Sequence, residues 1–487
     1  MLTPFFVVTL NDTCIQVCIG RIWPCIACSI RGRFLDALAL WTKAAANQRY
    51  QSINWGRPIR PLLFKPAAFV RTEMGVRRDL LLRFLLLYGM LYCSFGLSSP
   101  FLPAFLAARG VGSEWLGFLL GAGTAVRLFS APFAGRLADV FGAFRLELAL
   151  FAVAAAVASL LYLPVYYFWL LALVNLTQAA MLAPLVPLAD ALALSWSRST
   201  TRGNSGAFEY GWVRGMGSAA FIAGVLVAGQ SAAVWGLPSV LWFTAAGLFA
   251  AALSTRLVPD LAPRTNSTTQ KRKVIERDWL ILLREPVFVR MVLAAALVIG
   301  SHAMHDAFAI IRWRDAGISP AVSSVLWSES VGAEVLVFAL LGPWLLSLLG
   351  RSGALALAAG AAVVRWGVMA QTADVTTLAI IEPLHGLTFA LFHLGCMRII
   401  AETIPRSLAG TAQAFYGTVA IGGTTALLTV ASGWLFARFG SAGFWGMAFL
   451  CCAALPIIWS LQLSLPDLKT PGESLTKREA HRGFQGD

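Results

Sequence analysis

Twelve long apolar stretches, each of 20 residues or more, succeed one another between Leu80 and Leu465. About 20 apolar residues in an α-helix cross the hydrocarbon core of a bilayer, and a helix satisfies its backbone hydrogen bonds within itself. A transmembrane barrel would need a two-residue alternation, which these stretches lack. The sequence therefore predicts an all-α polytopic membrane protein with twelve transmembrane helices, at 82–107, 114–138, 145–164, 166–195, 209–231, 234–254, 287–311, 319–347, 352–372, 375–401, 407–437 and 441–465.

The composition excludes the main soluble classes. Of the 487 residues, 58% are hydrophobic and 13% are charged, and the mean hydropathy is +0.72. A soluble enzyme, a disordered chain or a disulfide-rich secreted scaffold needs a larger share of charged residues or cysteine. The net charge of +14 lies mostly between the apolar stretches, where basic residues set topology and meet lipid headgroups. We therefore expect the chain to contact a lipid bilayer and not nucleic acid.

The distribution of Lys and Arg predicts the orientation. If the first helix starts in the cytoplasm, the inner segments carry 21 basic residues, whereas the outer loops carry four, Arg109, Arg312, Arg314 and Arg438. Basic residues accumulate in cytoplasmic segments. We expect a multi-pass protein of the cell membrane, of the bacterial inner membrane type, with both termini in the cytoplasm.

The twelve stretches form two halves of six. A six-helix bundle is predicted at 74–254, a cytoplasmic central loop at 255–286, a second bundle at 287–465 and a cytoplasmic tail at 466–487. Glycine landmarks recur between the halves, Gly110 at Gly317, Gly142 at Gly350 and Gly211 at Gly417, at offsets of 207, 208 and 206 residues. A duplication of this kind is typical of transporters whose halves rock about a central site.

Residues 1–73 do not conform to this pattern, because they contain no apolar stretch long enough to span. Met74 is followed at once by basic residues and then by the first apolar stretch. We expect Met74 to be the true initiator and 1–73 to be a misassigned start; a regulatory or targeting arm is the alternative. Four cysteines lie in this extension, Cys14, Cys18, Cys25 and Cys28. No second cysteine pair or nearby His completes a zinc site with them.

A motif in the loop between the second and third stretches identifies a family. The segment from Gly135 to Arg145, GRLADVFGAFR, resembles the loop signature of the major facilitator superfamily. The resemblance implies a conformational role for Gly135, Asp139, Gly142 and Arg145, with Asp139 capping a helix or pairing with an Arg. The copy departs from the family pattern at Val140 and Ala143, where the family usually has basic residues. Arg136 and Arg145 are therefore the available partners for Asp139.

A finer resemblance covers Leu80 to Leu465, and it is to the branch of 3-phenylpropionate transporters, nucleoside–proton symporters and the lactose permease. The segment Pro184 to Leu192 resembles the fourth-helix motif of the phenylpropionate group. The segment Phe208 to Gly217 is similar to the fifth-helix entry of the lactose permease, and Leu384 to Phe389, preceded by Arg365, is similar to its ninth and tenth helices. The resemblance implies a monomer.

Charged residues inside the apolar stretches mark the candidate site. A charge at the bilayer centre costs about 2.5–3.5 kcal/mol even on the lenient insertion scale, so each such residue needs a partner or water. Each half contains both acidic and basic residues of this kind. They are Arg127, Asp190, Arg214, His302, His305, Asp306, Glu329, Glu334, Arg365, Glu382, His385 and His393.

Four of these residues are the candidate substrate-binding groups: Asp190, Arg214, Arg365 and His385. Asp190 and Arg214 flank the short loop between the fourth and fifth helices, so a pair is expected there. The resemblance implies that this pair belongs to the substrate site; a salt bridge at a helix end is the alternative.

Proton coupling is expected at Glu382, His385 and Glu334. Glu382 and His385 are three residues apart and share a helix face, and Arg365 of the preceding helix is expected to reach them. A His near a carboxylate and an Arg suits proton exchange. The lactose permease carries its proton carboxylate where this chain has Thr388, so the role is assigned to Glu382 or Glu334; Glu334 is alternatively a structural partner of Arg365.

His302, His305 and Asp306 follow the i, i+3, i+4 spacing of one helix face. We expect a polar cavity wall or gate there and no metal. Arg127 is assigned to the cavity, for structure or substrate.

The sequence thus predicts a secondary active transporter, not an enzyme, that moves a small organic solute with protons by alternating access. The best candidate for the cargo is an aromatic carboxylate of the 3-phenylpropionate type; a nucleoside or sugar symporter is the alternative, and a membrane sensor or enzyme the remote one. No Walker motif occurs, and no cofactor is expected.

Overall fold

The computed structural model describes residues 67–197, 208–261 and 278–464. The chain divides into two units, Leu2–Met74 and a larger one that begins at Gly75, and the account below concerns the larger. Three predicted parts lie outside the described residues. They are the extension 1–73 as far as residue 66, with its four cysteines, the middle of the central loop, and the tail 466–487.

The N-terminal half is made of helices that match the predicted stretches. They are α3 (Ala67–Ser98), α4 (Leu102–Ala108), α5 (Ser113–Phe141), α6 (Phe144–Leu161), α7 (Phe168–Leu182), α8 (Leu185–Ser197), α9 (Tyr210–Trp235) and α10 (Pro238–Ser254), followed by the 3₁₀ turn η2 (Thr255–Leu257). The fourth crossing is interrupted between α7 and α8 at Pro184, because proline has no backbone N–H to continue the helical hydrogen bonds.

The C-terminal half has more interruptions. Its elements are α11 (Asp278–Arg284), α12 (Pro286–Gly300), α13 (His302–Asp315), α14 (Pro320–Leu336), η3 (Val337–Leu341), α15 (Gly342–Gln371), α16 (Val375–Ile381), η4 (Gly386–Leu391), α17 (Phe392–Thr403), α18 (Ala409–Phe415), η5 (Tyr416–Gly423), α19 (Thr424–Phe439), η6 (Gly440–Gly443) and α20 (Phe444–Ser464). Three of these, η3, η4 and η5, are π-helical turns. Such turns occur frequently at functional sites.

The predicted membrane crossings are confirmed. Ten helical segments are long and apolar enough to span a bilayer. Two of them, Pro320–Gln371 and Ala409–Leu463, contain 52 and 55 residues, more than twice the length that one crossing needs. Each of these two long segments reverses direction at a glycine with positive φ, Gly350 in the first and Gly440 in the second. Each therefore contains two crossings, and the ten segments of the described residues account for twelve crossings.

The duplication is visible in the backbone as well as in the sequence. Gly110 and Gly317 both adopt φ of 85°, and each is followed by a residue whose N–H reaches back to the same relative carbonyl, Val111 to Leu106 and Ile318 to Trp313. The next helices, α5 and α14, therefore begin in register at an offset of 207. At the next loop Gly142 and Gly350, which are 208 residues apart, again both adopt a positive φ, 64° and 68°.

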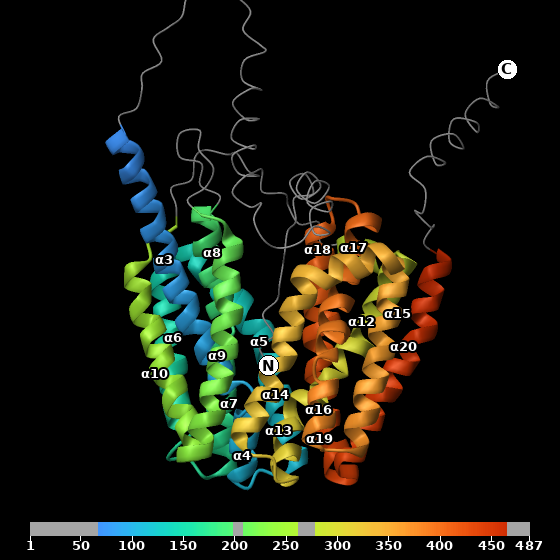
Figure 1. The fold of residues 1–487 in the computed structure, drawn as a ribbon. Helices are drawn as coiled ribbons and strands as arrows, with labels where there is room; N and C mark the ends of the chain where they lie inside the picture. Colours follow the sequence, from blue (N-terminus) through green and yellow to red (C-terminus); the bar gives the residue numbers. More distant parts are fainter. Residues whose placement is uncertain (1–66, 198–207, 262–277, 465–487) are drawn as a thin grey trace, which may run out of the picture. The chain divides into compact units, whose positions relative to one another are not determined.

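Figure 1 shows the blue-to-green helices of the first half beside the yellow-to-red helices of the second. Within this unit the halves pack mainly through two helix pairs, α5 with α19 and α9 with α14. The closest approaches are at glycines near the predicted outer ends of these helices. A Cβ added to Gly117 would lie 2.6 Å from the Gly433 Cα, and one added to Gly229 would lie 2.1 Å from the Ser324 Oγ.

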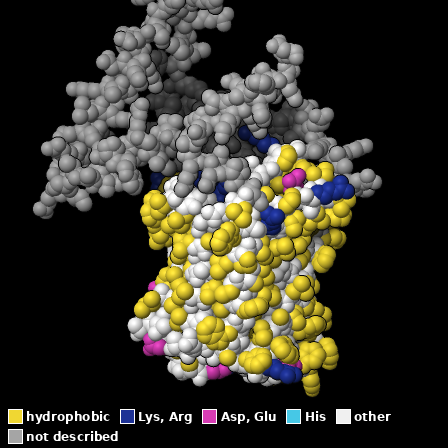
Figure 2. Space-filling view, turned by 90° about the vertical axis from the view of Figure 1, so that its right-hand side faces the viewer, with side chains coloured by type: hydrophobic (Ala, Val, Ile, Leu, Met, Phe, Trp, Pro, Cys, Tyr) yellow, Lys and Arg dark blue, Asp and Glu magenta, His cyan; other side chains and the backbone are white. Residues whose placement is uncertain are grey.

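The flank of the described part is apolar. Figure 2 shows hydrophobic side chains over most of one face, with Lys and Arg nearer its two ends. Large side chains such as Phe129, Tyr167 and Leu427 are 74–78% exposed. An apolar surface of this extent needs a non-aqueous neighbour, as a lipid-facing flank does.

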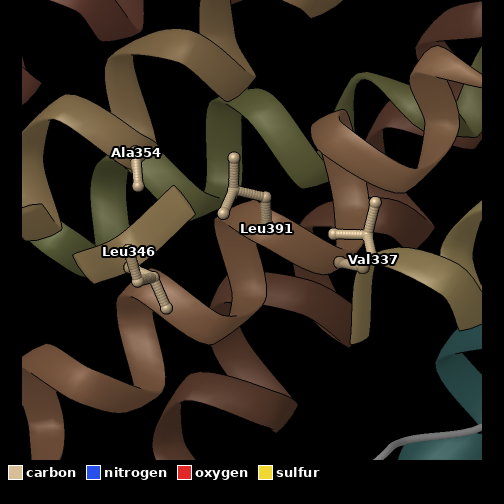
Figure 3. Close-up of a cluster of buried hydrophobic side chains, with 5 residues drawn as sticks. Val337, Leu346, Ala354 and Leu391 are labelled. Atoms are coloured by element: carbon tan, nitrogen blue, oxygen red, sulfur yellow. The ribbon is translucent and has the colours of Figure 1, made fainter. Parts of the chain in front are cut away.

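The π turns pack into an apolar cluster of the C-terminal half. Val337 of η3, Leu346 and Ala354 of α15, and Leu391 of η4 are all buried in it (Figure 3). This packing holds η4 against α15, and η4 directly follows the segment with the candidate residues Glu382 and His385.

Candidate functional site

The centre of the C-terminal half is a buried ion pair between Arg365 of α15 and Glu382, which directly follows α16. Both side chains are 0% exposed, and their NH2 and Oε2 atoms are 2.6 Å apart. Asp374 fixes the start of α16 by accepting a 2.8 Å bond from the Thr377 N–H; this bond lowers the pKa of the Asp374 carboxyl. Arg365 does reach Glu382, as the sequence predicts.

Both oxygens of Glu382 have partners. The Ser330 hydroxyl of α14 donates to Oε2 at 2.5 Å, and His305 Nε2 of α13 lies 3.2 Å from Oε1. The ring of His305 also stacks on Trp327 at 4.9 Å. Glu382 is therefore enclosed by partners from three other helices, and one of these partners, Ser330, is not predicted by the sequence.

Glu334 of α14 is the second buried carboxylate. It is 2% exposed, and its Oε2 lies 3.3 Å from His385 Nε2. Its Oε1 is buried and has no hydrogen-bond partner among the described residues. The alternative prediction of a direct pair between Glu334 and Arg365 is wrong, because His385 lies between the two side chains and contacts both.

The position of His385 determines its hydrogen-bonding roles. Arg365 NH1 lies 3.1 Å from His385 Nδ1, and a guanidinium can only donate. Nδ1 is therefore the acceptor, and Nε2 carries the hydrogen that it donates to Glu334. The ring of His385 is thus neutral, and Arg365 contacts both Glu382 and His385.

His302, His305 and Asp306 share a helix but face different partners. His302 Nδ1 lies 3.0 Å from the Ile299 carbonyl, to which it donates, so Nε2 accepts from the Thr388 hydroxyl at 2.9 Å. His305 bridges Glu382 and Asp306. In the described ranges no three His, Cys, Asp or Glu side chains are grouped so that they could hold a metal ion.

In the N-terminal half, Asp190 of α8 and Arg214 of α9 lie 3.6 Å apart. The Tyr88 and Tyr210 hydroxyls donate to Asp190 Oδ1 at 2.5 and 2.7 Å, and Arg214 donates to the Tyr92 hydroxyl. The predicted pair exists, and three tyrosines complete it. Tyr88 and Tyr92 are four residues apart on α3, and this spacing was the available signal.

Arg127 of α5 differs from the arginines of the two ion pairs, Arg214 and Arg365. It is half-buried, and its Nε and NH1 atoms are buried without a hydrogen-bond partner among the described residues. Arg214 and Arg365, by contrast, each have a carboxylate.

The loop motif does not form the expected latch. Asp139 is exposed and makes no ion pair within the part of the chain that the structure describes, whereas Arg145 pairs with Asp260 at 3.8 Å. Gly142, rather than Asp139, ends α5, because its φ of 64° favours glycine. Gly135 lies inside α5. No side chain caps the start of α5 or of α6 in this structure, and the conformational role of Asp139 stays a prediction.

Three of the four basic residues assigned to the outer loops lie in the last turn of a helix, Arg312 and Arg314 in α13 and Arg438 in α19. Arg312 is buried in α13 and donates to the Thr372 carbonyl at 2.6 Å. Arg109 plays the same part in the first half, where it donates to the Leu163 and Val165 carbonyls. Both side chains satisfy carbonyls at the ends of neighbouring helices, which have no partner within the helix.

A close backbone contact sets the distance between Glu334 and His385. A Cβ on Gly386 would lie 2.6 Å from the carbonyl oxygen of Ala333, the residue before Glu334. We expect Gly386→Ala to lower the free energy of unfolding by about 1–3 kcal/mol and to weaken transport, because η4 must move away from α14. Gly360→Ala is the matched control, since its Cβ meets nothing within 4 Å. Unfolding monitored by tryptophan fluorescence tests both; equal stability of the two variants would contradict the prediction.

Comparisons with known proteins agree on one kind of molecule. A model of the MFS_1 like family matches residues 81–447. The "Probable 3-phenylpropionic acid transporter" of Escherichia coli (strain K12) is 33% identical over 375 residues, which cover 76% of this chain and 94% of that protein.

Solved structures share the fold. The nucleoside transporter NupG is similar with a TM-score of 0.68 at 15% identity, over 79% of this chain and 98% of its own. A bacterial homologue of the human lysosomal transporter Spinster, in an inward-facing and unoccupied conformation, is similar with a TM-score of 0.61 at 12% identity, over 79% and 96%. At these identities the likeness concerns the fold alone.

Proposed function

Since this chain belongs to the MFS_1 like family, and is a membrane transporter of the major facilitator superfamily rather than an enzyme, we propose that it couples the movement of a small organic acid to protons. The best candidate for the cargo is an aromatic carboxylate of the 3-phenylpropionate type. The name of the E. coli relative supports this choice.

Glu334 carries the proposal of proton coupling. Its Oε1 is buried with no partner, and a buried carboxylate with a free oxygen is stabilised by binding a proton there. Glu382 is the less suitable of the two carboxylates, because Arg365, His305 and Ser330 occupy both its oxygens. We therefore assign the proton to Glu334 and a structural role to Glu382.

His385 links the proton site to the ion pair. It accepts from Arg365 at Nδ1 and donates from Nε2 to Glu334. When Glu334 takes up a proton on Oε1, the bond from His385 to Oε2 remains, and Arg365 keeps its two partners. A change of the protonation state at Glu334 therefore needs no charged histidine.

The contacts between the halves support a state closed at the predicted outer end. The close approaches at Gly117 with Gly433 and Gly229 with Ser324 lie there. Alternating access requires these contacts to separate in the opposite state. Small residues let the helix backbones meet and part without side chains that interlock.

The proposal is tested with the full chain in proteoliposomes that contain a pH-sensitive dye. Addition of 3-phenylpropionate is expected to drive proton movement, whereas nucleosides and disaccharides are expected to drive none. Proton movement with a nucleoside or sugar alone would replace the cargo class, and solute flux without any proton movement would remove the coupling.

A bulky residue at the outer contact is expected to block closure. Gly117→Trp cannot be accommodated where a single Cβ already lies 2.6 Å from Gly433. We expect net transport to fall at least ten-fold and the distance between spin labels at Glu114 and Arg438, measured by double electron–electron resonance, to increase. Gly360→Trp is the control; unchanged label distances in the Gly117 variant would show that this contact does not form the outer closure.

A further inference from the structure

A buried arginine without a counter-charge remains after the ion pairs of both halves have been assigned. Arg127 Nε and NH1 are buried and make no hydrogen bond within the described residues. A buried charge is costly unless an opposite charge and hydrogen bonds compensate it. An arginine cannot escape this cost by losing its proton, because the guanidinium stays charged in proteins. The geometry therefore calls for an anion that the described residues do not supply.

The surroundings of Arg127 place it where the two halves meet. The next residue, Leu128, lies against Gly422 of η5 in the other half, since a Cβ on Gly422 would be 2.4 Å from the Leu128 side chain. One turn away, Ser130 donates to the Ala180 carbonyl of α7 at 3.0 Å. Arg127 lies at about the middle of α5 (Ser113–Phe141), a helix that packs both against α7 of its own bundle and against α19 and η5 of the opposite one.

The duplication relates Arg127 to the proposed proton site. Glu334 follows Arg127 by 207 residues, which is the offset that aligns Gly110 with Gly317 and the start of α5 with the start of α14. The two residues therefore hold the same position in equivalent helices. Both have buried polar atoms without partners, Nε and NH1 on one side and Oε1 on the other, and their charges are opposite.

We propose that Arg127 binds the carboxylate of the cargo, an organic monocarboxylate, while Glu334 binds the proton; this assignment rests on the proposed function. A guanidinium binds a carboxylate with two parallel charge-assisted hydrogen bonds. Arg214 and Arg365, the two arginines that the sequence suggests, already hold Asp190 and Glu382 at 3.6 and 2.6 Å. Arg127 can bind an anion without breaking such a pair.

The assignment explains why cargo and proton would move together. With the carboxylate on Arg127 and the proton on Glu334, each of the two equivalent positions has its missing partner. With only one of them bound, the other half retains an uncompensated polar group. The doubly loaded and the empty transporter also have the same net charge, since the cargo brings one negative and the proton one positive charge.

The test compares an acid with its neutral analogue. Binding of 3-phenylpropionate and of 3-phenylpropionamide to the full chain in detergent is measured by isothermal titration calorimetry. Hydrogen bonds to charged groups contribute about ten- to one-hundred-fold in affinity, so Arg127→Gln is expected to weaken binding of the acid by that factor and to remove the preference for acid over amide. Arg438→Gln is the control, because Arg438 is exposed and contacts only the Trp434 ring.

Each outcome decides the matter. If Arg127→Gln retains the affinity and preference of the wild type, Arg127 is not the anion site, while the proposed function stands. If the wild type binds nucleosides or sugars and no carboxylate, the proposed cargo class fails as well. If Arg127→Gln does not fold, Arg127→Lys decides: it keeps the charge but not the paired hydrogen bonds, and affinity for the acid equal to that of the wild type would overturn the proposal.

Discussion

Replacement of Glu334 by Gln is expected to abolish proton movement driven by the cargo while leaving cargo exchange across the membrane. Glutamine keeps the size of the side chain and can accept the bond from His385 Nε2 at the position of Oε2. It cannot bind or release a proton. A variant fixed in the protonated-like state should still exchange external for internal cargo, because exchange needs no net proton transfer.

The measurement uses proteoliposomes with a pH-sensitive dye for proton movement and labelled cargo for exchange. Glu329→Gln is the matched control, because Glu329 lies on the same helix, α14, and is only partly buried. We expect Glu329→Gln to keep both activities. Persistent proton movement in the Glu334 variant would exclude Glu334, and Glu382 would then be the next carboxylate to test.

The second large effect is expected on stability. Glu382→Gln leaves the Arg365 guanidinium, which is 0% exposed, without its carboxylate. Removing one partner of a buried ion pair costs about 3–5 kcal/mol, because the remaining charge is neither paired nor hydrated. We therefore expect a large fall in the free energy of unfolding. Denaturant titration in mixed micelles measures it.

A double variant separates the lost pair from other damage. Arg365→Met with Glu382→Gln removes both charges, so it should be less destabilised than the sum of the two single changes. Glu402→Gln is the control, since Glu402 is in a partly exposed pair with Arg398 at 2.8 Å, and exposed pairs contribute about 0–1 kcal/mol. Equal losses for Glu382→Gln and Glu402→Gln would contradict the central role of the buried pair.

Much of the fold follows from the sequence, because a bilayer permits few solutions. The predicted stretch 114–138 is α5 (Ser113–Phe141), and the predicted stretch 209–231 is α9 (Tyr210–Trp235). Local signals were less complete. The three π turns of the C-terminal half have no sequence signal that we recognised.

The sequence predicted which residues belong to the candidate site but not which of them contact one another. Charged residues in apolar helices are rare and costly, so Glu334, Arg365, Glu382 and His385 stand out in the sequence. Their spacing suggested that Glu382 and His385 act together on one helix face. In the structure both residues contact Arg365, but His385 pairs with Glu334, and His305 from another helix is the histidine that contacts Glu382.

The sequence by itself determined which segments cross the membrane, where the chain repeats and which charged residues lie inside, because apolar length, glycine at turns and the cost of a buried charge are properties of single segments. Only the tertiary structure decided which charges are already compensated. Partners such as Ser330 for Glu382 and Tyr210 for Asp190 come from other helices, and their distances depend on how those helices pack. The same packing leaves Arg127 and Glu334 with unpartnered atoms, and this difference is invisible in a sequence where every buried charge looks equally in need of a partner.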